Sequence, residues 1–126
     1  MKHFRISAAL AVSVALIASA AQAMTVQEFL AAAAGIPRNP TAMLRSDTRR
    51  LIAEVRGAVR TVNTERETAV AAGRPPAFCP PAGARVSISP DTLLARLNSI
   101  PVSRRNISVT QAMREWMADR YPCPAA

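Results

Sequence analysis

Apolar residues recur at helical spacing through the middle of the chain, from about Asp47 to Ala72, with no proline to interrupt them. At roughly 100° per residue their side chains gather on one side of a helix. These residues are Leu51, Ile52, Val55, Ala58, Val59, Val62, Ala69 and Val70. Arg49, Arg56 and Arg60 line another edge. The pattern predicts one long amphipathic helix with an apolar stripe for the core and a basic flank.

The apolar stripe also approximates the a and d positions of a coiled coil, which makes a homodimer seam an alternative. The stripe is short for a coiled coil, and valine and alanine dominate it. We therefore expect it to pack within its own domain, with a homodimer as the alternative.

Capping signals predict a short helix before the long one. Thr25 and Glu28 have the spacing of a capping box, and Gly35 followed by Pro37 ends the helix that the box begins. Asn39-Pro40 then restarts the chain with a capping residue and a proline at the first helical position. Asp47 offers a further start signal for the long helix.

A loop and a third helix follow the long one. Residues 73–87 hold four prolines and two glycines, which predicts a loop, although residues 85–88 could form a brief extended piece. Ser89-Pro90 caps and opens the third helix, which ends before Pro101. Its apolar face is expected to consist of Leu93, Leu94, Leu97 and Ile100.

The last helix begins after a polar link, at a predicted capping box of Ser108 and Gln111. Arg114, Glu115 and Asp119 lie on its polar side. Its apolar side consists of Val109, Ala112, Met113, Trp116 and Met117, so Trp116 is expected in the core. The fold class predicted from these elements is all-α, a small domain of four to five helices with one long central helix.

The N-terminus has the three parts of a secretory signal peptide. Lys2 and Arg5 give a positive start, residues 6–17 are apolar, and Ala21-Gln22-Ala23 is a small-residue cleavage site. The apolar stretch falls short of the roughly 20 residues that a membrane span requires. We expect residues 1–23 to be removed, residues 24–126 to form one domain without a membrane span, and the protein to be periplasmic.

Two cysteines, Cys79 and Cys123, remain in the predicted mature chain. In an oxidising compartment an even number of cysteines far apart in sequence favours a disulfide, whereas in the cytosol the two would more often be free thiols. A bond between them closes a loop of about 45 residues, and the chain-entropy model assigns roughly 4 kcal/mol to such a loop. The sequence therefore predicts a disulfide-stapled domain.

Charge and composition narrow the kinds of functional site that the predicted mature chain can contain. Of the chain's 16 basic residues the leader carries two, Lys2 and Arg5, which leaves 14 arginines beside 8 acidic residues and a net charge of +6. Arginine suits carboxylates and phosphates, although most of these side chains are expected to be solvated. The only histidine, His3, leaves with the leader, which excludes histidine-based catalysis and His-ligated metal sites. We expect no catalytic residues, no enzyme activity, no metal, no cofactor and no nucleic-acid partner.

Three motifs carry a resemblance to a known family. They are the Phe-Cys-Pro-Pro run at 78–81, the leucine helix at 92–97 that ends near Ile100-Pro101, and the Tyr-Pro-Cys-Pro run at 121–124. In these motifs, over roughly its C-terminal half, the chain resembles the Rap1a/Tai immunity proteins. The resemblance implies a small, exported, disulfide-stapled helical protein that blocks a peptidoglycan-cleaving amidase effector delivered by type VI secretion. It also implies a possible homodimer, because characterised members are dimeric.

An inhibitor of this kind binds through a few anchor residues. We expect Arg104, Arg105 and Asn106, in the link before the last helix, to be the first candidates, and Arg56 and Arg60 the second. A solvated turn is the alternative for Arg104 and Arg105. The alternative function is a periplasmic chaperone or a protein that binds an anionic envelope polymer, without a toxin partner.

Overall fold

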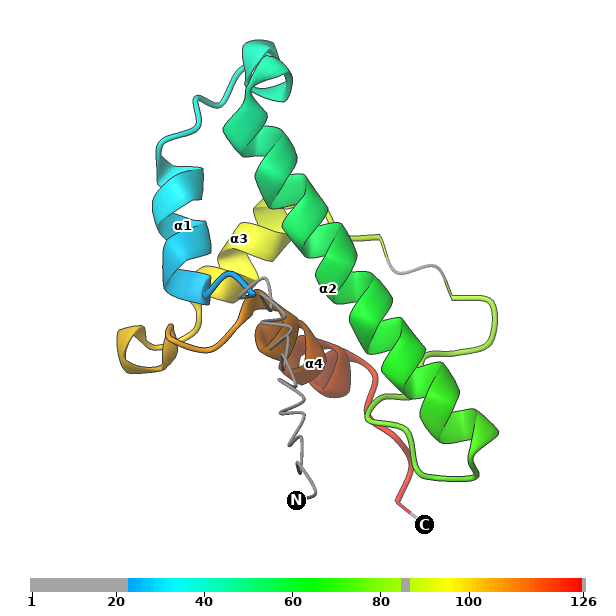
Figure 1. The fold of residues 1–126 in the computed structure, drawn as a ribbon. Helices are drawn as coiled ribbons and strands as arrows, with labels where there is room; N and C mark the ends of the chain where they lie inside the picture. The colour runs from blue at the N-terminus through cyan, green and yellow to red at the C-terminus, as the bar shows by residue number, and fades with distance from the viewer. Residues whose placement is uncertain (1–22, 85–86, 126) are drawn as a thin grey trace, which may run out of the picture.

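The long helix predicted in the middle of the chain is the largest element of the fold (Figure 1). The structure is a computed structural model, and it describes residues 23–84 and 87–125. Its α-helices are α1 (Val26–Ala34), α2 (Ser46–Ala71), α3 (Pro90–Asn98) and α4 (Val109–Arg120), and its 3₁₀ helices are η1 (Pro40–Leu44) and η2 (Val102–Arg104). The described residues contain no strand, only an isolated bridge between Thr25 and Ser108. The all-α prediction with one long helix is confirmed.

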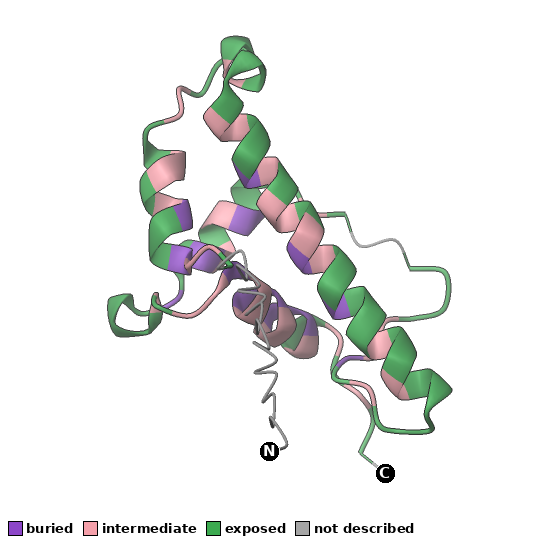
Figure 2. Ribbon diagram, in the orientation of Figure 1, coloured by how far each residue is buried: buried purple, intermediate pink, exposed green. Residues whose placement is uncertain are grey.

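α2 packs across α4 and α1, and α3 packs against α1 (Figure 1). The buried residues of α2 are Leu51, Ala58 and Val62, which lie on the side of the helix that faces α4 and α1 (Figure 2). All five apolar residues predicted for α4 are buried, and Trp116 is among them. The apolar stripe of α2 is therefore used inside the domain, as expected.

The predicted stripe extends too far at its C-terminal end. Val70 is 54% exposed, so its assignment to the core face was wrong. The physical reason is position, because the last turns of α2 extend beyond α4 and have no helix to pack on (Figure 1).

Most of the predicted helix ends are confirmed. The Thr25–Glu28 capping box is complete, with both of its hydrogen bonds present, and Ser89 caps α3 by accepting a hydrogen bond from the backbone N–H of Thr92. α2 begins at Ser46, one residue earlier than predicted.

The capping box predicted for α4 is only half formed. The Ser108 hydroxyl accepts a hydrogen bond from the Gln111 backbone N–H at 3.0 Å. The Gln111 side chain does not return the bond, because its oxygen accepts instead from the Arg114 guanidinium at 2.9 Å. The cap therefore satisfies one orphan N–H at this helix start rather than two.

A Schellman motif ends α2 where the sequence predicts. Gly73 adopts a φ of +69°, a conformation that glycine tolerates and other residues rarely adopt. The backbone N–H of Gly73 then donates to the Val70 carbonyl, and that of Arg74 donates to the Ala69 carbonyl. Of the extended piece predicted at 85–88, residues 85–86 lie outside the described residues, as does most of the predicted leader, and residues 87–88 are described and belong to no strand. Among the helices that are described, none has the length and apolar character to cross a bilayer.

Candidate functional site

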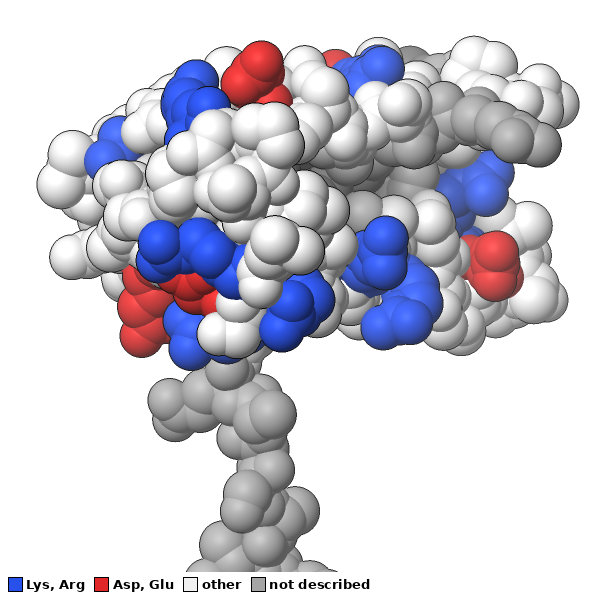
Figure 3. Space-filling model, turned by 90° about the horizontal axis from the view of Figure 1, so that it is seen from above, with Lys and Arg blue, Asp and Glu red and all other residues white. Residues whose placement is uncertain are grey.

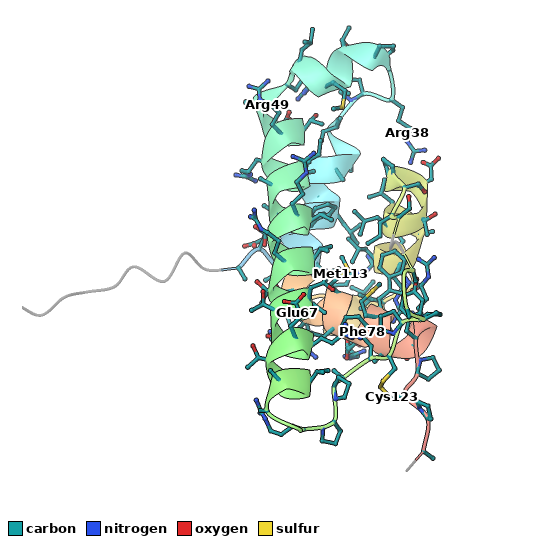
Figure 4. The ribbon with its side chains drawn as sticks, turned by 90° about the vertical axis from the view of Figure 1, so that its right-hand side faces the viewer. Arg38, Arg49, Glu67, Phe78, Met113 and Cys123 are labelled. Atoms are coloured by element: carbon teal, nitrogen blue, oxygen red, sulfur yellow. A yellow bond between two sulfur atoms is a disulfide. The ribbon has the colours of Figure 1, made fainter. Side chains whose placement is uncertain are left out.

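The two cysteines form a disulfide below the crossing of α2 and α4 (Figure 4). Cys79 and Cys123 have their Cα atoms 4.8 Å apart, and the Cys79 backbone N–H donates to the Tyr121 carbonyl at 2.8 Å. Phe78, the residue before Cys79, is 1% exposed and lies among core side chains. The predicted staple is confirmed, and it fixes the loop after α2 to the chain end after α4.

The link between α3 and α4 holds the first predicted anchors in internal contacts. Arg104 pairs with Glu115 of α4, with 2.6 Å between Nη2 and Oε1. Arg105 is half-buried, and its guanidinium donates to the carbonyl oxygens of Ile100 at 2.9 Å and Asn98 at 3.0 Å. Asn98 is the last residue of α3 and Ile100 lies two residues beyond it, so Arg105 caps the C-terminal end of this helix.

The third residue of that set, Asn106, is exposed. In Figure 1 the turn that carries all three residues lies by the lower end of α1, away from the middle of α2. The structure therefore does not bring the two groups of predicted anchors, 104–106 and 56–60, into one patch.

The second predicted pair lies on the outer face of α2. Arg56 and Arg60 are exposed, and no ion pair or side-chain hydrogen bond engages either of them within the described part of the chain. Arg49 points outward from the same helix (Figure 4) and donates to the Leu44 carbonyl at 3.1 Å. We call Arg49, Arg56 and Arg60 the arginine face of α2. Figure 3, seen from above, shows blue side chains along the lower edge of the domain, with red side chains among them at its left.

A shallow depression of about 400 Å³ adjoins this face, lined by Gly57, Arg60, Thr61, Thr64 and Glu65. Gly57 contributes no side chain, and a Cβ added there meets nothing within 4 Å. The depression is therefore open to a partner's side chains. A second cavity, of about 10 Å³ beside Met113 and Met117, is too small for anything beyond a single water.

Other arginines connect the helices to one another. Arg114 of α4 donates two hydrogen bonds to Glu65 of α2, at 2.6 and 2.8 Å, and these bonds lower the pKa of the Glu65 carboxyl. Arg96 pairs with Asp119 at 2.8 Å and so joins α3 to α4. The sequence predicts that these side chains lie on the polar faces of their helices. It does not predict which of them pair, because the partners are far apart along the chain.

Two further arginine contacts are local. Arg66 stacks over the ring of Phe78, with its guanidinium carbon 5.8 Å from the ring centre. Hydrogen bonds from the Arg45 guanidinium lower the pKa of the Asp47 carboxyl to about 2 at the start of α2. The arginines thus fall into those that hold the fold and those, such as Arg56 and Arg60, that are open to a partner.

The described residues contain no group of three or more His, Cys, Asp or Glu side chains that could hold a metal ion. Comparison with protein-family models, with curated proteins and with solved structures gives no match to this chain.

Proposed function

We propose that this chain is an exported binding protein that blocks a partner protein by contacting its acidic surface with the arginine face of α2. One observation carries the proposal: Arg56 and Arg60 are exposed and have no carboxylate partner within the described residues. Each guanidinium fork can therefore bind a partner's carboxylate without first breaking an internal ion pair.

The arginine face is favoured over the link as the main contact. Arg105 already donates to two backbone carbonyls, and Arg104 already pairs with Glu115. A partner would have to displace those internal contacts, which costs part of the binding energy it provides. The net charge of +6 predicted for the mature chain would also speed encounter with an acidic partner.

The motifs around Cys79 and Cys123 suggest which partner to test first. Their resemblance to the Rap1a/Tai immunity proteins supports a periplasmic role in which a peptidoglycan amidase effector is the target. Inhibition of this kind needs a complementary surface rather than catalytic groups, which agrees with a mature chain that contains no histidine.

The test is titration calorimetry of the mature protein against a cell-wall amidase encoded beside it, together with a peptidoglycan hydrolysis assay. We expect saturable binding and loss of hydrolysis at equal molar ratio. If the protein neither binds nor inhibits the amidase but prevents aggregation of unfolded periplasmic proteins, the immunity proposal is wrong and the chaperone alternative replaces it.

A further inference from the structure

The first residue of the predicted mature chain is docked on the domain through its backbone. The Met24 nitrogen donates to the Glu54 carboxylate of α2, with 3.1 Å between N and Oε1. The Met24 carbonyl accepts from the Val109 N–H at 2.8 Å, and the Val26 N–H donates to the Ile107 carbonyl at 2.9 Å. The position of the Met24 nitrogen is therefore set by hydrogen bonds further along the same segment.

Glu54 is half-buried, and among the described residues the Met24 nitrogen is its one hydrogen-bond partner. Ala23, on the other side of the predicted cleavage site, is exposed. Hydrolysis of the Ala23–Met24 bond turns the Met24 amide into an α-amino group, which is largely protonated near neutral pH. The carboxylate then faces a cation where it previously faced a neutral N–H group.

We propose that Glu54 is the receptor for the α-ammonium group that removal of residues 1–23 creates at Met24. The inference uses the predicted cleavage site and is independent of the proposed partner. A hydrogen bond between two charged groups is roughly twice as strong as a neutral one, and partial burial protects it from screening. The processed domain is therefore more stable than the same domain with any extension before Met24.

The segment that contains Met24 also forms hydrogen bonds with the link between α3 and α4. The Gln27 N–H donates to the Arg105 carbonyl at 2.9 Å, and the Val26 N–H donates to the Ile107 carbonyl. The segment that begins at Met24 thus holds residues 105–107 against the start of α1.

The composition of the chain offers a selective test. No lysine follows Met24, so the α-amino group is the only primary amine of the predicted mature protein. An N-hydroxysuccinimide ester of acetic acid will acetylate that amine, which removes the charge and keeps one N–H donor. The acetyl group takes the place that the Ala23 carbonyl occupies before cleavage, so it introduces no new bulk.

The experiment compares thermal unfolding before and after acetylation in exported protein whose mass confirms Met24 as its first residue. We expect the melting temperature of the wild type to fall by about 4 °C or more, and that of Glu54→Gln by under about 1 °C. Glu67→Gln is the matched control, because Glu67 is an exposed carboxylate of the same helix, and it should respond like the wild type. A chain that retains Ala23 should melt like the acetylated wild type.

Equal losses in the wild type and in Glu54→Gln would overturn the proposal, because the charge would then act without the carboxylate. A mature chain that begins at another residue would overturn it as well. An Ala23-retaining chain as stable as the processed chain would also overturn the proposal. This comparison needs no substitution at Glu54.

Discussion

The two connections on either side of α3 are held in place by different chemistry. The loop before α3 is fixed at Phe78 and Cys79, by burial of the Phe78 ring and by the Cys79–Cys123 bond. The link at 99–108, after α3, has no covalent bond to another element. It is held by burial of Ile100, by hydrogen bonds from Arg105 to the Asn98 and Ile100 carbonyls, and by hydrogen bonds from the 24–27 segment. The loop therefore combines one redox-sensitive bond with a buried aromatic ring, whereas the link is held by non-covalent contacts alone.

Phe78→Ala tests the non-covalent anchor of the loop. The buried ring leaves a cavity on removal, so we expect a loss of about 3 to 5 kcal/mol in the free energy of unfolding from urea titrations. Val102→Ala, at a residue that is 76% exposed, should cost less than about 0.5 kcal/mol. A loss below about 1 kcal/mol for Phe78→Ala would mean that the disulfide alone fixes the loop.

The covalent anchor is tested by Cys79→Ser, Cys123→Ser and the double variant. Each single variant should lose about 2 to 4 kcal/mol, and the double variant no more than either one, because all three remove the same bond. Circular dichroism melts of the wild type with and without reductant should reproduce the difference. Additive losses would mean that the two residues contribute separately rather than through one bond.

This difference explains what the sequence could and could not predict. Cys79 and Cys123 were paired correctly because the predicted mature chain contains two cysteines, which offer one pairing. The cap formed by Arg105 was not predicted, because its partners are backbone carbonyls, which every residue carries. A charged pair in a loop is usually solvated or functional, so Arg104 and Arg105 were placed among the candidates for partner binding.

The helices show the same division between features that the sequence predicts and features that it does not. The face of α4 that contains Trp116 was predicted completely, because local spacing sets which side of a helix is apolar. The exposure of Val70 depends on where α4 ends in space, and the Glu65–Arg114 pair joins residues 49 positions apart. Neither relation is contained in a local pattern.

Arg105→Ala measures how much the hydrogen-bonded link contributes. Loss of two charge-assisted bonds to carbonyls should cost about 1 to 3 kcal/mol. Arg104→Ala, which removes one surface ion pair from the same link, should cost less than about 1 kcal/mol. Hydrogen exchange of the 105–109 amides should accelerate in the first variant only. Equal losses in the two variants would contradict the capping role.

The smallest expected effect is the pH dependence of the Glu65–Arg114 pair, which sharpens the contrast between ionic and covalent contacts. Arg114 lowers the pKa of Glu65 below its ordinary 4.5, so the pair stabilises the folded state above that pH and loses its effect as the pH falls. The wild type should exceed Glu65→Gln by less than about 1 kcal/mol at pH 7, because both side chains are partly exposed and water screens the pair. Urea titrations should show this advantage shrinking below pH 4.5; an advantage that grows in acid would contradict the assignment.

The central claim is that the arginines of the link hold the fold while those of α2 are open to a partner. Calorimetry against the proposed partner, a cell-wall amidase encoded beside this chain, tests it most directly, with Arg56→Glu/Arg60→Glu compared with Arg104→Glu. The double variant should weaken binding by more than about 2 kcal/mol, and Arg104→Glu by less than about 1 kcal/mol. Arg74→Glu/Arg120→Glu reverses two exposed charges off the arginine face and controls for net charge. Binding that is lost with Arg104→Glu and kept with Arg56→Glu/Arg60→Glu would contradict the account.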